Sequence, residues 1–182
     1  TGITKFSQLS IFSTINNLTN ISMDPEFSTI CGITKDELDT VLKEDIALLA
    51  SKNHVSFERM RELLRENYDG YHFSREGEDI FNPYSLMRSF AAGFIDNYWY
   101  ASGTSTYLIH QMQHFHTDVT TLDDMFAFSS SFDRPTEKMS DALPLLYQSG
   151  YLTIKGYDPE FQLYTLAYPN KEVRKGFIES LM

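Results

Sequence analysis

The segment HQMQHFH, residues 110–116, holds the densest group of potential metal ligands in the sequence. His110 and His114 are four residues apart, so a helix would place both imidazoles on one face, where they could share a metal ion. His116 and Asp118 follow close behind. The glutamate of the H-E-x-x-H motif, which serves as the general base, is missing. Histidines that face solvent or cap a helix end are the simpler interpretation, so His110 and His114 are kept as candidates and no metal is assigned.

Two other residues have side chains of a catalytic type but no sequence neighbours that would activate them. Asp69 lies in the segment NYDGYHF, and an aspartate before a glycine ordinarily forms a turn. Cys31 is the only cysteine, which excludes an internal disulfide and a site made of several cysteines. No histidine is adjacent to it, and we expect it to be packed in the interior, as free cysteines commonly are. Neither residue is assigned a catalytic role.

The motifs that bind phosphate or activate a nucleophile are absent from the sequence. A P-loop needs G-x-x-x-x-G-K-[ST], and here no glycine is followed by lysine. A Rossmann glycine triplet and a G-x-S-x-G elbow are also missing. A nuclease of the PD-(D/E)XK type needs Glu-x-Lys on a strand with an aspartate upstream, and no suitable pair occurs. The residues alone therefore predict a non-catalytic helical module that carries no cofactor of its own.

Composition predicts a globular chain that does not bind nucleic acid through general charge. The 182 residues are 42% hydrophobic and 14% aromatic, enough for a substantial core, and the formal net charge is -10. Clustered lysine and arginine, which binding to phosphate backbones requires, are not found. The most basic segment, NKEVRKGF at residues 170–177, contains its own acid and is typical of a solvated helix face. No secretory signal or membrane-spanning run is present, so a cytoplasmic location is expected.

The elements that must position these residues are mostly helices. Thr34 and Glu37 form a capping box in GITKDELDTVLKEDIALLA, residues 32–50. The apolar positions of this segment recur at steps of three and four residues and predict one helix: Leu38, Val41, Leu42, Ile46 and Leu49. Ser56 caps a second helix in SFERMRELLRENYDGY, which Gly70 ends.

A third helix begins at Asn82 and Pro83, because asparagine caps well and proline suits the first helical position. We assign its apolar face to four residues: Tyr84, Met87, Phe90 and Ala91. The segment HFSREGEDIF before it is a charged hairpin or loop. A helix follows around Tyr107 to Phe115, and TTLDDMFAF, residues 120–128, is predicted to be another short helix.

The C-terminal segment has the clearest pattern in the chain. A helix in EKMSDALPLLYQSG, residues 137–150, is followed by the strand YLTIKGY, a turn at Asp158 and Pro159, and the returning strand FQLYTLAY. A helix in NKEVRKGFIESLM ends the chain. Helix, hairpin and helix in this order are typical of a winged-helix unit. The predicted fold class is mainly α with a small antiparallel β-hairpin, arranged as a helical lid-like bundle plus a winged-helix-like unit.

Several stretches, taken together, resemble one known family. They are TGITKFSQLSIFSTINNLTNIS, CGIT, NYDGYHF, NPYSLMRSF, YWYASGTSTYL, LPLLYQSGYLTIKGYD and YPNKEVRKGF, and they span nearly the whole chain in the expected order. The family is that of the predicted AAA-ATPase-like proteins, in which a P-loop domain of the signal-transducing (STAND) type is usually followed by a PD-(D/E)XK nuclease-like domain. The pairing of YQSGYLTIKGYD with YPNKEVR is the most distinctive.

The resemblance implies that this chain is the middle part of a longer protein. Residues 1–32 would correspond to the end of the ATPase core, residues 33–100 to a helical lid and residues 101–182 to a winged-helix-like region. In the family, a segment similar to TGITKFS follows the last core strands, where a polar residue senses the γ-phosphate. By position the candidates for nucleotide sensing are Thr4, Lys5 and Ser7. ATP and Mg²⁺ are implied for the parent protein, with none held by this segment.

Three functions follow as hypotheses. In the first, the segment is a non-catalytic regulatory part that couples nucleotide state in an upstream P-loop domain to a downstream nuclease-like domain, with nucleic acid bound only through the parent. In the second, it is a DNA-binding winged helix, although the segment EKMSDALPLLYQ is near neutral and holds Pro144. In the third, it is a protein-interaction module anchored by Tyr98, Trp99 and Tyr100.

Overall fold

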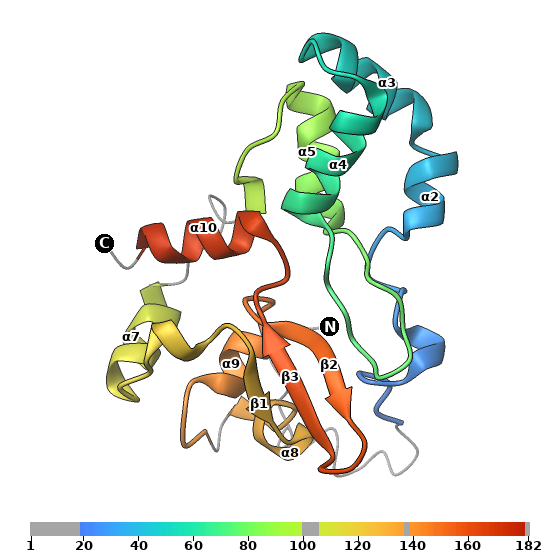
Figure 1. The fold of residues 1–182 in the computed structure, drawn as a ribbon. Coiled ribbons are helices and arrows are strands. Elements are labelled where there is room, and N and C mark those ends of the chain that lie inside the picture. The colour runs from blue at the N-terminus through green and yellow to red at the C-terminus, as the bar shows by residue number, and fades with distance from the viewer. Residues whose placement is uncertain (1–18, 100–105, 137–138, 181–182) are drawn as a thin grey trace.

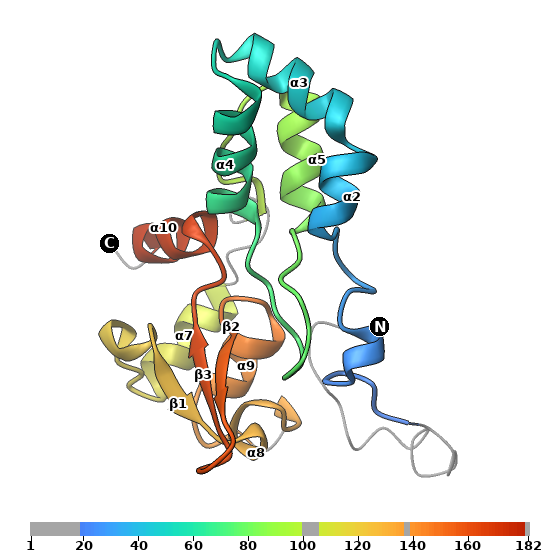
Figure 2. The ribbon, with the colours of Figure 1, turned by 45° about the vertical axis from the view of Figure 1, so that its right-hand side comes forward.

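The computed structural model describes residues 19–99, 106–136 and 139–180. Within these ranges the chain has a helical part at one end and a small sheet with short helices at the other (Figure 1). The second view shows the loop between α4 and α5 descending from the helical part alongside β2 (Figure 2). The predicted class, mainly α with a small antiparallel sheet, is confirmed for the described residues.

The helical part follows from caps and apolar periodicity. Its elements are η1 (Pro25–Phe27), α2 (Lys35–Thr40), α3 (Lys43–Lys52), α4 (Phe57–Tyr68) and α5 (Pro83–Ala92). The predicted capping box is present, because the Glu37 N–H donates to Thr34 Oγ1 at 3.2 Å and the Thr34 N–H donates to Glu37 Oε2 at 2.8 Å. The core of this part consists of buried residues from all four α-helices and the loop before α5: Leu38, Ile46, Leu49, Met60, Leu64, Tyr68, Phe81 and Leu86.

The single helix predicted over residues 32–50 is instead two helices with a break between Thr40 and Lys43. Thr40 and Val41 are both β-branched, which lowers helix propensity. The N–H groups of Val41 and Leu42 both donate to the Glu37 carbonyl, at 2.9 and 3.2 Å, so the regular hydrogen-bond ladder stops there. Val41 therefore leaves the predicted apolar face, and 73% of it is exposed.

The predicted apolar face of α5 is only partly correct: Phe90 is partly buried and packs against the helical core, but Ala91 is exposed. Asn82 caps this helix as expected, with Oδ1 accepting from the Tyr84 N–H at 3.0 Å. However, about half of Tyr84 and of Met87 is exposed. The buried residues are Ser85, Leu86 and Ser89. Two of the three are small polar residues, so a rule that searches for large apolar side chains does not find this face.

The second part contains the sheet. Its elements are α7 (Thr106–His114), η2 (Val119–Thr121), β1 (Met125–Ala127), α8 (Ser129–Phe132), α9 (Leu143–Gln148), β2 (Thr153–Asp158), β3 (Leu163–Ala167) and α10 (Lys171–Ser180). In the described part of the chain the sheet has three antiparallel strands in the order β1-β3-β2. The β2–β3 hairpin and the helix after it agree with the prediction. The helix α10 lies between the foot of α4 and the sheet (Figure 1).

Two predictions for this part need correction. The segment of residues 120–128 was expected to be helical, but Met125–Ala127 pairs with β3 as an edge strand, through partners that the local sequence cannot reveal. The helix expected over residues 137–150 begins only at Leu143, because Pro144 has no N–H for an internal helical bond and is confined to the first turn. No described helix has both the length and the apolar character that crossing a membrane requires.

Candidate functional site

The two parts meet where the residues after α4 reach the sheet. We call residues 69–73 (DGYHF) the junction segment. Thr153 of β2 is fully buried, and its Oγ1 both accepts from the His72 N–H and donates to the His72 carbonyl, each at 2.8 Å. Asn170, just before α10, donates from Nδ2 to the Asp69 carbonyl at 3.0 Å. The junction segment is therefore bound to the sheet through its backbone.

Gly70 makes this approach sterically feasible. Its φ is +94°, a conformation that L side chains rarely adopt. A Cβ at this position would lie 2.3 Å from the carbonyl oxygen of Pro169 and 2.9 Å from Lys155 Nζ. The backbone of the junction segment thus runs directly against the chain that leads into α10.

Lys155 reaches the junction segment because β2 is irregular at this position. The pairing of β2 with β3 shifts between Ile154 and Gly156, which places Lys155 in a bulge. Its Nζ donates to the carbonyl of Gly70 at 2.6 Å and to that of Pro169 at 3.2 Å. Burial lowers the pKa of Lys155, while Asp79 and Asp69 act in the opposite direction. The ammonium group therefore joins three separate stretches of backbone at one point.

Two carboxylates flank this lysine and have opposite pKa shifts. Burial raises the pKa of Asp69, against the hydrogen bond that its Oδ1 accepts from the Gly70 N–H at 2.7 Å. The pKa of Asp79 is lowered, chiefly by the hydrogen bond from His72 Nδ1 at 3.0 Å. The side chain of Asp69 is only 13% exposed, and that of His72 18%. These groups hold the loop between α4 and α5 in place. Asp69, which was expected to form a turn, is instead the C-cap of α4 with an extended backbone.

Glu172 is the second unusual group of the junction. It lies in the first turn of α10, it is 1% exposed, and its Oε1 accepts from the Trp99 N–H at 2.8 Å. Its other oxygen, Oε2, and the buried hydroxyl of Ser85 on α5 have no hydrogen bond of good geometry. Burial raises the pKa of Glu172 to about 7, although the nearby Ser85 hydroxyl and the backbone N–H groups of Trp99 and Tyr98 oppose the shift. The carboxyl is therefore poised between its two protonation states near neutrality.

The charged groups at the centre of the junction are engaged in contacts within the protein. The two oxygens of Asp69 and the Nζ of Lys155 already have partners, and those partners come mainly from backbone. Among residues 19–99, 106–136 and 139–180, no group of three histidine, cysteine, aspartate or glutamate side chains is placed to hold a metal ion. The junction therefore joins two parts of the molecule with polar contacts, and burial shifts the pKa of three of its groups, Asp69, Lys155 and Glu172.

The two histidines singled out from the sequence are not part of the junction segment. His110 and His114 are both on α7 and both exposed, and the His114 ring contacts Phe115 edge to face at 5.0 Å between centroids. The nucleotide-sensing candidates Thr4, Lys5 and Ser7 lie outside the described residues.

Two sequence interpretations change. Cys31 was expected to be packed in the interior and is exposed instead. The segment of residues 170–177 has its basic side chains in solvent, as predicted, but its acid, Glu172, is buried. No local signal marks this burial, because the groups around the carboxyl, Ser85 and Trp99, are more than seventy residues earlier in the sequence.

Replacing Thr153 with valine tests the backbone contact across the junction. Valine keeps the shape and volume of the side chain but leaves the N–H and the carbonyl of His72 without their partner. We expect the free energy of unfolding to fall by about 2 kcal/mol in urea denaturation followed by circular dichroism. Thr165→Val, on β3 facing Gly156, is the matched control and should cost less than about 0.5 kcal/mol. Equal costs for the two variants would contradict the assignment.

Comparison with known proteins adds one distant relative. No family model matches the chain, and no solved structure matches it. The chain is similar to a curated but uncharacterized protein in the vnfD 5′ region of Azotobacter chroococcum mcd 1, with 31% identity over 186 residues. The match covers 100% of this chain and 33% of the relative. The chain thus spans about a third of the length of the curated relative that it matches.

Proposed function

We propose that this chain is a non-catalytic transducing segment of a cytoplasmic AAA-ATPase-like protein. It would couple the nucleotide state of an upstream P-loop domain to a downstream nuclease-like domain, so ATP and Mg²⁺ would be bound by the parent and not by this segment. The observation that carries the proposal is the junction, where the helical part and the sheet part are joined by directed hydrogen bonds to backbone. Directed hydrogen bonds fix how the two parts are placed against each other, whereas apolar contact is non-directional.

The contacts of the junction would pass a motion of α4 on to the sheet part. The end of α4 continues into the junction segment, whose carbonyls at Asp69, Gly70 and His72 are each bonded to the sheet part. At the surface the salt bridge between Lys171 and Glu66, at 2.7 Å, adds a link between α10 and α4. A rotation of α4 would therefore displace β2 and α10 together. Coupling of this kind needs packed elements with two arrangements, and the half-titrated Glu172 supplies a group whose charge can favour one of them.

The order of elements also supports a winged-helix-like interpretation of the second part. From α7 to β3 the chain runs helix, strand, helix, helix, strand and strand, and the sheet order β1-β3-β2 places the hairpin at one edge. DNA binding is not favoured by the details. In α9, which would be the recognition helix, Pro144, Leu145, Leu146 and Tyr147 are buried, and the helix carries no basic residue. A base-reading helix needs exposed polar or basic side chains.

Protein interaction is the second candidate, on different residues from those the sequence suggested. Tyr98 and Trp99 are partly buried, and Tyr100 lies outside the described residues. Instead, Phe126 on the edge strand β1 is 67% exposed, and Phe128 just after it is 53% exposed. An exposed edge strand with aromatic side chains offers both unpaired backbone groups and apolar area to a partner.

The first experiment measures nucleotide binding by the 182-residue chain. Isothermal titration with Mg-ATP should give no saturable heat, and no phosphate should be released on incubation. Micromolar affinity for Mg-ATP would contradict a segment without phosphate-binding machinery and would remove the proposal.

The second experiment tests coupling in a longer protein of the family that the chain resembles. Amide hydrogen exchange is measured with and without Mg-ATP in the parent and in its Thr153→Val variant. The nucleotide should change protection in both α4 and α10 of the parent, and in the variant the change in α10 should be lost while that in α4 remains. If protection in α10 is insensitive to nucleotide in the parent, the proposed coupling through the junction is wrong.

A further inference from the structure

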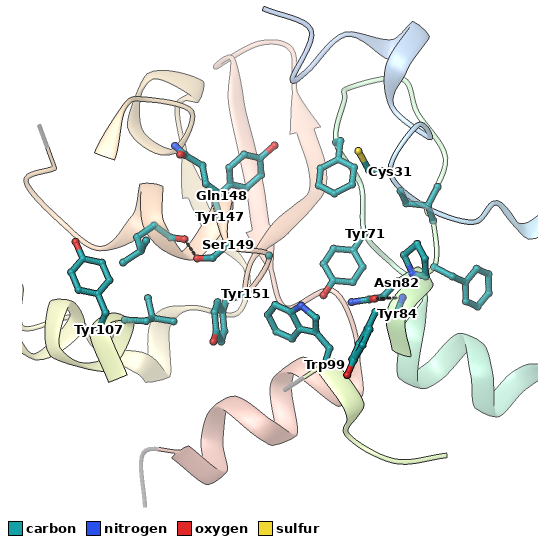
Figure 3. Close-up of a pocket in the computed structure, with 17 residues that line it drawn as sticks. Cys31, Tyr71, Asn82, Tyr84, Trp99, Tyr107, Tyr147, Gln148, Ser149 and Tyr151 are labelled. Carbon is teal, nitrogen blue, oxygen red and sulfur yellow. Dashed lines mark hydrogen bonds between the residues drawn. The ribbon is translucent and has the colours of Figure 1, made fainter. Parts of the chain in front are cut away.

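A cavity of about 800 Å³ opens beside the junction, within the size range of sites for small ligands (Figure 3). Residues from both parts line it, so it lies where the helical part and the sheet part meet. Aromatic rings make up much of its wall, and Figure 3 shows Tyr71, Trp99 and Tyr151 side by side across its centre. The rings of Trp99 and Tyr151 are in edge-to-face contact, with centroids 5.1 Å apart. These rings offer flat apolar surfaces to an occupant.

The described residues that line the cavity carry no formal charge. Among them there is no aspartate, glutamate, lysine, arginine or histidine, although the chain as a whole has a net charge of -10. An anion would lose its hydration here without meeting an opposite charge on the described wall, which costs several kcal/mol or more. The described wall therefore disfavours anions and suits an uncharged, largely apolar compound.

Tyr71 supplies one polar group in the wall that lacks a partner. The residue is 7% exposed, and its buried Oη has no hydrogen bond of good geometry. Burial raises the pKa of Tyr71, while the neighbouring Asn82 side chain lowers it, and the net shift is upward. The phenol therefore stays protonated at neutral pH and remains a hydrogen-bond donor. A buried donor without an acceptor costs about 1–3 kcal/mol, which a ligand that accepts its proton would recover.

The backbone around Gly150 leaves room next to this donor. Gly150 has a φ of +82°, and a Cβ there would come within 3.4 Å of Tyr71 Cε1 and 3.8 Å of Trp99 Cζ2. Glycine at this position keeps the space between the two rings and the end of α9 open. The apolar rings and the unpaired hydroxyl thus line the same cavity.

We propose that this cavity binds a small, uncharged, planar heteroaromatic compound whose ring nitrogen or oxygen accepts a hydrogen bond from Tyr71. The aromatic walls contribute stacking and edge-to-face contacts, and the Tyr71 hydroxyl fixes the orientation of the ring. Binding at this site is independent of the coupling role proposed above, because it requires neither a P-loop domain nor motion of α4.

The test uses the fact that Trp99 is the only tryptophan of the chain and lines the cavity. The 182-residue chain is labelled with fluorotryptophan, so that its fluorine NMR spectrum reports on this site alone. The probes at neutral pH are quinoline, which has an acceptor nitrogen, and naphthalene, which has the same shape without one. Quinoline should shift the signal saturably, with a dissociation constant of about 0.1–1 mM for a ligand of this size, and bind about fivefold more tightly than naphthalene.

Tyr71→Phe should weaken quinoline binding about five- to tenfold and leave naphthalene within about twofold, so that the preference for quinoline disappears. Tyr157→Phe, the same chemical change on β2 away from the cavity wall, should alter neither affinity. Naphthalenesulfonate, which adds a negative charge to the same ring system, should not bind.

Three outcomes would overturn the proposal. One is the absence of a saturable shift with both uncharged probes. Another is equal affinity of the wild-type chain for quinoline and naphthalene, a comparison that needs no variant to fold. The third is binding of a blocked phenylalanine-containing peptide when neither small probe binds, which would make the cavity a docking site for a protein segment.

Discussion

Replacing Gly70 with alanine is expected to lower the free energy of unfolding by about 3 kcal/mol or more, because two costs add. The φ of +94° is unfavourable for any residue with a Cβ, at about 1–2 kcal/mol. The new Cβ would also lie 2.3 Å from the carbonyl oxygen of Pro169, which is backbone and cannot rotate away. Relief of that clash requires the junction segment to move off the sheet part, with loss of the hydrogen bond from Lys155. Urea denaturation measured by circular dichroism would give the value.

Gly93→Ala is the matched control for this prediction. Gly93 ends α5 with a φ of +86°, so it has nearly the same backbone strain. Its Cβ would meet only the flexible side chain of Lys52, with Cδ at 3.3 Å, which is able to move. We therefore expect a loss of about 1 kcal/mol. A similar loss for Gly70→Ala would show that the contact with Pro169 contributes nothing and that the junction is loosely packed.

The predictions from sequence that hold are those that depend on neighbours in the chain. Thr34, Ser56 and Asn82 begin helices because the groups that they cap are two or three residues away. The β2–β3 hairpin was predictable for the same reason, since alternating residues flank a turn at Asp158 and Pro159. In each case the physical cause and its effect lie within one short stretch.

The predictions from sequence that are wrong concern residues whose structure depends on contacts with distant parts of the chain. Met125–Ala127 forms a strand because β3, some forty residues later, offers it a free edge. Lys155 would be predicted to be an ordinary solvent-facing strand residue, and its partners, the carbonyls of Gly70 and Pro169, are distant in the sequence. Ser85 is buried on α5, where large apolar residues were expected. The junction itself could therefore not be predicted, although NYDGYHF was recognised as a distinct segment.

Glu172 should make the stability of the protein depend on pH in the opposite sense to an ordinary ion-paired carboxylate. Burial raises its pKa in the folded chain to about 7 from 4.5, so the folded state holds the proton more tightly than the unfolded state. As pH rises from about 4.5 to about 7, the unfolded chain loses this proton first, and the contribution to stability falls by about 3 kcal/mol. Above that window the contribution is constant. The nearby charge of Asp96 contributes to this raised pKa.

Glu172→Gln should remove this loss, because the amide resembles the protonated acid. Its oxygen is able to accept from the Trp99 N–H, and its NH₂ is able to donate toward the Ser85 hydroxyl, which otherwise lacks a partner. Urea denaturation at about pH 8 should show the variant to be more stable than the wild type by about 2–3 kcal/mol, with near equality at about pH 5. Glu179→Gln, an exposed change on the same helix, should leave the pH dependence between these values as it is in the wild type. A difference in stability between the wild type and Glu172→Gln that does not grow with pH across this window would mean that Glu172 is ionised when folded. The carboxylate would then be held by a partner, and the two parts of the molecule would be joined by a fixed charge in place of a proton-dependent contact.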